Sequence, residues 1–311
     1  MAFLYALPGA VAEGLIWGLM AIGVYISYKI LDIADLTVDG SICTGAGVCA
    51  VLLSMGVPAW VSVLIALLAG AITGIVTGLL HTLLGIPSIL AGILTQLMLY
   101  SVNLLTLSGK SLMPIDPRAN VLLVHMSDNH GSIVSLLLIV VATIFLLYEF
   151  FYTEIGLTLK STGDNPDMSR AQGVDVNRNK VIGLAISNGI VAMAGALLAQ
   201  YKGSANINDG RGAIVIGLAA IFIGLSVSLK IKPNFVVSLI GVTCGGIVYY
   251  IVYNFVILMG LKTDYLKMLS AIIVALFLGI PYLKTKYFTK QKDLHPSDLI
   301  AKAKAGGDGH A

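Results

Sequence analysis

Polar residues that could do chemistry are few in this sequence, and several of them lie inside long apolar segments. Polar side chains in such segments are costly, so they usually face the interior of a helical bundle or a path through it. Six residues have this character: Glu13, Gln96, Asn103, Asn188, Gln200 and Asn254. Three tyrosines, Tyr249, Tyr250 and Tyr253, lie close to Asn254. Hydrogen bonding between helices explains such residues as well as a path does, so residue type alone leaves both readings open.

Catalytic and metal-binding chemistry has little support in the sequence. Cys43, Cys49 and Cys244 lie in apolar stretches without CxxC spacing or a nearby histidine, so we expect packing roles for them. The five histidines are scattered, and no Ser-His-Asp or Cys-His set is readable. We predict no catalytic residue, no metal site and no cofactor, and therefore no enzyme.

The segment SGKS at 108–111 resembles the end of a phosphate-binding loop. The full motif requires a glycine where Leu104 stands, and no strand precedes the segment. We therefore reject it as a nucleotide site and predict that any ATP is bound by another chain.

The composition indicates lipid as the surrounding solvent. Hydrophobic residues make up 57% of the 311 residues and charged residues only 11%, against about 25% charged residues in soluble domains. The mean hydropathy is +0.92. The net charge of +3 is small and gives no indication of nucleic-acid binding. We predict an all-α fold, a polytopic membrane helical bundle.

A membrane-spanning helix needs about 20 apolar residues. The expected spans are 8–28, 59–80, 86–107, 132–152, 181–201, 213–229, 234–258 and 264–283. The shorter segment 41–56 is barely long enough to cross and could instead be broken or re-entrant. We expect eight to nine transmembrane helices in one domain, 1–284, followed by a flexible cytoplasmic tail, 285–311. The N-terminus lacks the basic region of a cleaved signal peptide, so we expect the first span to be retained.

The distribution of basic residues predicts the orientation. Placing the Lys-rich segment after Pro281 in the cytoplasm also places Lys29, the polar island 161–180 and the turn at 230–232 there, with most of the nineteen basic residues. With nine crossings, the N-terminus is then outside.

Glycines recur every fourth residue on three expected helices. The pairs and triplets are Gly14 and Gly18, Gly70, Gly74 and Gly78, and Gly241 and Gly245. Small residues at this spacing let helix backbones approach closely in lipid, so we expect helix contacts at these positions.

The polar island contains the signals of a short helix with a defined start and stop. Asn165 is a good N-cap, Pro166 suits the first helical position and Asp167 favours the positive end of the helix dipole. Gly173 suits a left-handed stop. Either a docking surface for a cytoplasmic partner or a solvated connector fits this segment.

Four segments together resemble a known family. EIGLTLKSTGDNPDMSRAQGVDV, AISNGIVAMAGALLAQ, GAIVIGLAAIFIGLSV and GLMAIGVYISYKILDIADLTVDGSICTGAGVCA resemble, in their order along the chain, permease subunits of bacterial ATP-driven (ABC) importers for branched-chain amino acids and ribose-type sugars. The resemblance implies a permease in the bacterial plasma membrane, working as a dimer with a second permease copy or homologue. It also implies ABC ATPase subunits inside and an extracytoplasmic solute-binding protein outside.

In this family the short cytoplasmic helix is a coupling helix that docks on the ATPase. The implied ATPase-coupling residues are Asp164, Asn165, Pro166, Asp167, Met168, Ser169, Arg170, Ala171, Gln172 and Gly173. We expect Asn188, Gln200, Tyr253 and Asn254 to line the translocation path, and the binding protein to dock on 108–131 and 202–212. The resemblance also favours an amino acid as the solute, before a sugar or nucleoside.

Two other transport classes have sequence requirements of their own. A self-sufficient, ion-coupled secondary transporter would need buried coupling carboxylates and paired broken helices, and the sequence places only Glu13 clearly inside a span. A channel would need a filter motif, and none is readable. ATP-driven import is the function that the sequence favours, and the secondary transporter is the alternative.

Overall fold

The computed structural model describes residues 2–116, 122–228 and 234–258, together with 268, 271, 272, 274, 275 and 279. Contacts divide the chain into Met1–Val274 and Ala275–Ala311, and the description below concerns the first unit. Its long helices are α1 (Ala2–Tyr25), α3 (Ala59–Thr82), α4 (Ser88–Thr106), α5 (Asn129–Tyr152), α8 (Val176–Lys202) and α10 (Phe235–Leu258). The shorter helices are η1 (Ile26–Ile30), α2 (Val38–Ser54), α6 (Glu154–Asp164), α7 (Pro166–Ala171) and α9 (Ala213–Ser228), and β1 (Leu112–Pro114) pairs antiparallel with β2 (Ser204–Asn206).

Six helices among the described residues are long and apolar enough to cross a membrane. These six are α1 continued through η1, α3, α4, α5, α8 and α10; α2 and α9 are shorter apolar helices. An all-α polytopic bundle is therefore confirmed, whereas the predicted count of eight to nine crossings depends also on α2, α9 and 264–283. Most of 264–283 and all of the predicted tail 285–311 lie outside the described residues.

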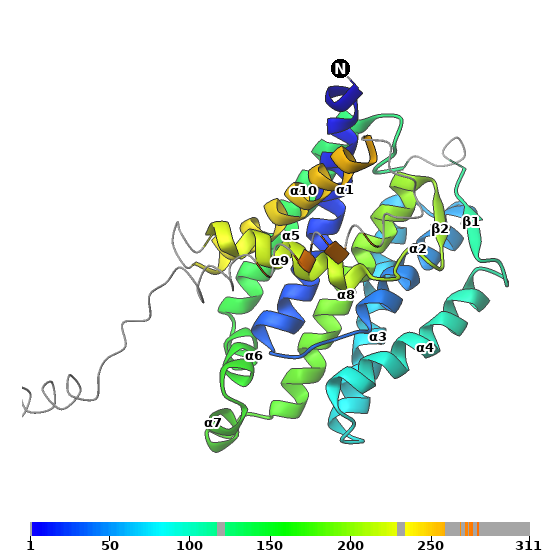
Figure 1. The fold of residues 1–311 in the computed structure, drawn as a ribbon. Helices are drawn as coiled ribbons and strands as arrows, with labels where there is room; N and C mark the ends of the chain where they lie inside the picture. The colour runs from blue at the N-terminus through cyan, green and yellow to red at the C-terminus, as the bar shows by residue number, and fades with distance from the viewer. Residues whose placement is uncertain are drawn as a thin grey trace, which may run out of the picture. The chain divides into compact units, whose positions relative to one another are not determined.

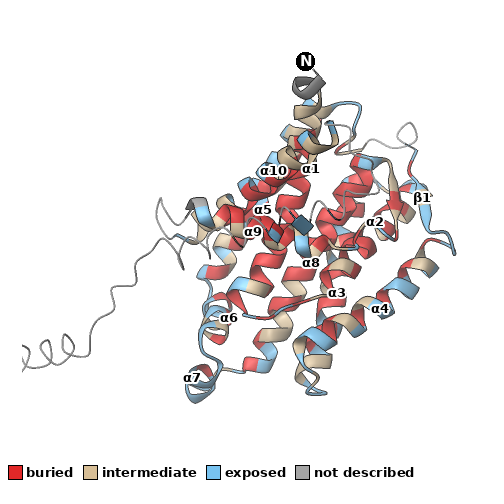
Figure 2. Cartoon of the chain, in the orientation of Figure 1, coloured by how far each residue is buried: buried red, intermediate tan, exposed pale blue. Residues whose placement is uncertain are grey.

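Helix α8 is the centre of the bundle and packs against α1, α2 and α3 (Figures 1 and 2). Its contact with α3 is made through the glycines of α3: a Cβ at Gly70 would overlap the backbone of Asn188, and one at Gly74 would overlap that of Leu184. The glycine pairs of α1 and α10 likewise lie against neighbouring backbones. The predicted close helix contacts are confirmed, because only glycine leaves room for them.

Helices α2 and α9 begin beside each other although they are far apart in sequence. The Asp39 carboxylate, in the first turn of α2, accepts hydrogen bonds from the backbone N–H groups of Gly212 and Ile214, both at 2.9 Å. These donors belong to the start of α9, whose first N–H groups have no partner within the helix. A carboxylate from the first turn of α2 therefore holds the start of α9.

The three aspartates of ILDIADLTVDGS lie in three different environments. Asp32 is exposed, Asp35 is buried between α2 and α8, and Asp39 holds the start of α9. They separate because the chain between η1 and α2 is not helical, and Asp32 has a left-handed φ of +54°.

Candidate functional site

Helix α7 is present and has the ends that the sequence predicts. The Asn165 side chain accepts a hydrogen bond from the N–H of Met168 at 3.0 Å, Pro166 is the first helical residue, and Gly173 has a φ of +82°. Met168 is 61% exposed, and Arg170 forms a surface ion pair with Asp167 at 3.5 Å. Such pairs contribute little, about 0.2–1 kcal/mol, so the caps and the neighbouring helices hold this helix.

One of the predicted coupling residues faces inward. Ser169 is 3% exposed, and its hydroxyl donates to Oγ of Ser161 in α6 at 3.2 Å. Ser169 therefore anchors α7 on α6 and is unavailable to a partner. The outward surface of α7 consists of its other residues, with Met168 as its large apolar side chain.

Helix α6 attaches α7 to the membrane-spanning bundle. Gly163 lies so close to the backbone of Ile30, at the end of η1, that a Cβ would overlap it. On the other side, Asn179 in the first turns of α8 donates to Oγ1 of Thr162 at 3.0 Å. Helix α6 therefore connects α7 to the end of η1 and to the start of α8.

Deeper in the bundle is a network of hydrogen-bonded side chains, here named the buried polar cluster. Its members are Asp35, Thr37, Ser41, Thr73, Thr77 and Asn188, and all are buried. Asn188 donates to Asp35 at 2.6 Å and accepts from Ser41 at 2.6 Å. The hydroxyls of Ser41 and Thr73, and those of Thr37 and Thr77, are each 2.7 Å apart. The cluster joins the chain before α2 to α3 and α8, and its members satisfy one another.

The four residues predicted to line a path lie in separate places. Asn188 belongs to the buried polar cluster. Gln200 is fully buried, accepts from the N–H of Leu123 at 3.0 Å and donates to Sγ of Cys49 at 3.4 Å. Tyr253 stacks on Tyr249, with ring centroids 6.3 Å apart. The structure therefore does not bring these residues together, and their role in transport stays a prediction.

Asn254 lines a cavity of about 250 Å³ at the start of α1. Glu13, Tyr201 and Asn129 also line it, and Tyr201 donates to Oδ1 of Asn129 at 3.0 Å. Asn254 itself donates to the carbonyl oxygen of Tyr250 in its own helix, at 3.3 Å. This cavity is the place where the predicted residues Glu13 and Asn254 meet.

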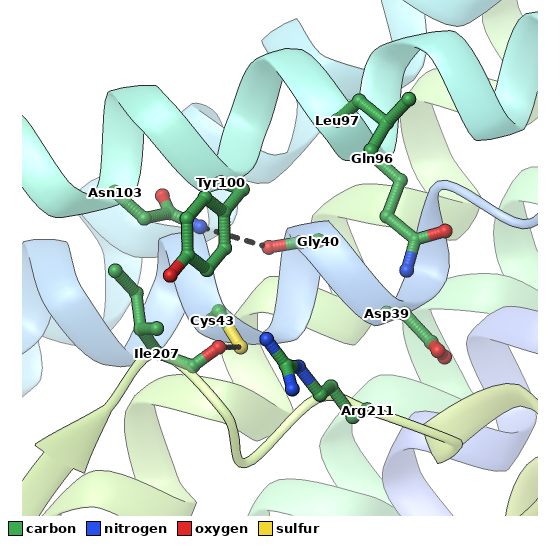
Figure 3. A pocket seen from close by; sticks show the side chains of 9 residues that line it. All are labelled: Asp39, Gly40, Cys43, Gln96, Leu97, Tyr100, Asn103, Ile207 and Arg211. Carbon is green, nitrogen blue, oxygen red and sulfur yellow. Dashed lines mark hydrogen bonds between the residues drawn. The ribbon is translucent and has the colours of Figure 1, made fainter. Parts of the chain in front are cut away.

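A second polar cavity, here named the open cleft, lies between α2, α4 and the segment joining β2 to α9 (Figure 3). Its volume is about 270 Å³, and its lining residues are Asp39, Gly40, Cys43, Gln96, Leu97, Tyr100, Asn103, Ile207 and Arg211. Asn103 donates to the carbonyl oxygen of Gly40 at 3.3 Å, and the Cys43 thiol donates to that of Ile207 at 3.2 Å. Among the described residues, no group of three or more His, Cys, Asp or Glu is placed to hold a metal ion.

Sequence reasoning identified Gln96 and Asn103 as polar residues within spans but missed Asp39, Tyr100 and Arg211 as lining residues. Arg211 was placed in an external segment, because nothing in the order NINDGRG predicts that this segment folds down along α2. One signal was available in the sequence: the segment 41–56, just after Asp39, is barely long enough to cross a membrane.

Comparison with known proteins decides the family. The profile of the family described as "Branched-chain amino acid transport system / permease component" matches residues 9–287. The chain belongs to this permease family. The permease is 37% identical over 268 residues to the "Tyrosine transport system permease protein" of Clostridioides difficile (strain R20291), a match that covers 86% of this chain and 88% of that protein.

Two further relatives are similar over different shares of their length. The permease is 32% identical to "Uncharacterized protein RP368" of Rickettsia prowazekii (strain Madrid E), over 87% of this chain and 95% of that protein. It is 28% identical to the "Autoinducer 2 import system permease protein LsrC" of Photorhabdus laumondii, over 60% of this chain and 57% of that protein. No solved structure matches the chain. The permease is a multi-pass transport subunit, as the resemblance in sequence predicted.

Proposed function

We propose that this permease is the membrane subunit of an ATP-binding-cassette importer that carries a small amino-acid-type solute into a bacterial cell. In this proposal α7 faces the cytoplasm and docks on an ABC ATPase subunit. A solute-binding protein delivers the solute on the opposite side, and a second permease copy or homologue completes the path. The amino-acid preference is supported by the tyrosine transport relative.

The attachment of α7 carries the proposal. The helix is capped at both ends, presents Met168 outward and is fixed through α6 to η1 and α8. A solvated connector needs none of these contacts, whereas a lever that transmits movement between an ATPase and the bundle needs all of them. The Asn165 cap alone stabilises such a helix by about 1 kcal/mol.

The test is uptake of labelled amino acids into vesicles that hold the permease with its ATPase and binding protein. Met168→Asp should abolish ATP-dependent uptake and copurification of the ATPase, because a carboxylate replaces the apolar contact. Met55→Asp is the matched control. Met55 is 72% exposed and comes just before the start of α3. The other end of α3 lies beside Lys180, near the start of α8 and therefore near α7. Met55 is thus a full helix length away from α7.

Normal uptake by Met168→Asp with the ATPase bound would reduce α7 to a connector. The secondary transporter remains the second candidate, because Asp35 is a carboxylate buried deep in the bundle. Uptake by the permease alone, without ATP and abolished when ion gradients are dissipated, would establish that alternative and remove the importer.

A further inference from the structure

The open cleft contains a cation, the guanidinium of Arg211. In the part of the chain that the structure describes, no hydrogen bond or ion pair reaches the guanidinium of Arg211. Figure 3 shows this guanidinium directed into the space shared by Gln96, Tyr100 and Asn103. A guanidinium has five N–H donors in a planar fork, and the neutral side chains around it do not neutralise its charge.

The acidic groups near Arg211 are already engaged elsewhere. Asp39 accepts from the backbone of Gly212 and Ile214, at the start of α9. Asp209, on the same segment as Arg211, pairs with Lys202 at 3.6 Å. The fold therefore provides partners for both carboxylates and leaves the guanidinium facing the cleft.

Arg211 is an exposed residue, and the contacts of its own segment set its position. The segment that carries it packs along α2, since the N–H of Gly210 donates to Sγ of Cys43 at 3.2 Å and a Cβ at Gly210 would overlap the backbone of Asp39. The adjoining Ile42 backbone lies against Gly195, about 10 Å of helix before Lys202. A charge at this level is costly in lipid and is found facing a water-filled cavity or a counter-charge.

We propose that Arg211 binds the carboxylate of the transported solute in the open cleft, through a bidentate hydrogen-bonded pair. The proposal rests on the function proposed above and adds the group that recognises the solute. A volume of about 270 Å³ is just below the usual range of ligand pockets, which suits a solute as small as one amino acid. Guanidinium–carboxylate pairs combine charge with fixed geometry, so a sugar without a carboxylate is not held in this way.

The test is protection of an introduced cysteine from alkylation in the purified permease, without nucleotide. Leu97 lines the cleft and is 64% exposed, whereas Leu105, on the same helix, is 79% exposed and does not line it. Leu97→Cys and the control Leu105→Cys are made in a background with Cys244→Ser, because Cys244 is the exposed one of the native cysteines and Cys43 and Cys49 are buried.

Three probes separate the groups of the solute: L-tyrosine, its desamino analogue 3-(4-hydroxyphenyl)propionate, which keeps the carboxylate, and tyramine, which lacks it. We expect L-tyrosine and the desamino analogue to slow alkylation of Leu97→Cys and not of Leu105→Cys, while tyramine slows neither. Adding Arg211→Gln should raise the half-protecting concentration of L-tyrosine about tenfold or more, the effect of losing a charged contact. Arg211→Lys should restore part of the protection, because it keeps the charge and loses the fork.

Any of three results would overturn the proposal. The first is equal protection with and without Arg211→Gln, and the second is protection by tyramine as strong as by L-tyrosine. The third is no protection by either carboxylate. These outcomes do not depend on ATP or on a binding protein. They are therefore separate from failure of the importer function, which would appear as uptake without ATP.

Discussion

The buried polar cluster and the open cleft are two polar regions of one apolar bundle, and they treat their charged groups in opposite ways. In the cluster, Asp35 receives bonds from the N–H of Thr37 at 2.9 Å and from Asn188 at 2.6 Å. In the cleft, the Arg211 guanidinium has no acceptor among the described residues. A satisfied network fixes helices to one another, whereas an unpaired charge is available to a solute.

The difference explains why the polar residues of the spans cannot be treated as one set. Asn188 and Gln200 hold neighbouring elements together, and each is fully buried. Tyr100 and Gln96, which look no more functional in sequence, line an accessible cavity. Changes in the cluster should therefore affect the stability of the permease, and changes in the cleft should affect its solute.

The largest effect is expected from Asn188→Leu. It leaves the Asp35 carboxylate and the Ser41 hydroxyl without their amide partner inside the bundle, which costs about 1–3 kcal/mol for each unsatisfied group and more for a charged one. Thermal unfolding in detergent should show a large fall in the midpoint and a loss of monodisperse protein. The control is Asn103→Leu in the cleft wall, since the Asn103 side chain makes one long hydrogen bond among the described residues, to Gly40 at 3.3 Å. An equal loss in both variants would erase the distinction.

A smaller loss is expected from Gly74→Ala, in the α3 wall of the cluster. The added Cβ overlaps the Leu184 carbonyl, so α3 must move away from α8 at a cost of about 1–3 kcal/mol. Gly47→Ala is the matched control, because the nearest atom to its added Cβ is 3.7 Å away, in the Leu107 side chain. The same thermal measurement should place Gly47→Ala at or above the parent, and a destabilised Gly47→Ala would argue against steric overlap as the cause.

Asn165→Ala should have an effect of about 1 kcal/mol on the local stability of α7, because the Met168 N–H loses its cap. Amide hydrogen exchange over 167–172 should rise while exchange in α8 stays constant. Asn165→Asp serves as the control, since aspartate caps as well as asparagine. Unchanged exchange in Asn165→Ala would mean that contacts with α6 alone hold the helix.

The smallest stability effect is expected from Arg211→Gln. Its guanidinium makes no hydrogen bond or ion pair within the described part of the chain. The free energy of unfolding should therefore change by no more than about 0.5 kcal/mol, which is a small shift of the unfolding midpoint. Asn188→Leu, in the buried polar cluster, should destabilise the permease strongly, whereas Arg211→Gln, in the open cleft, should not. A marked destabilisation by Arg211→Gln would show that Arg211, like Asn188, is a structural residue.

Local patterns determined much of this protein. Apolar runs of about 20 residues predict helices within a few residues of α3, α4, α5, α8 and α10, because lipid requires backbone bonds to close within each segment. The cap residues Asn165 and Gly173 predict the ends of α7, since capping involves atoms only a few residues apart. The glycine repeats predict close helix contacts for the same local reason.

The sites depend on contacts between distant segments, and the tertiary structure alone decided them. Asp35 meets Asn188 and Asp39 meets Gly212 across more than a hundred residues, so no spacing in the sequence reveals either pair. Whether a buried amide joins helices or lines a cavity is set by its neighbours in space, which separates Asn188 from Gln96. The position of Arg211 follows from one long-range fact: the segment after β2 is drawn along α2 by Cys43 and Asp39.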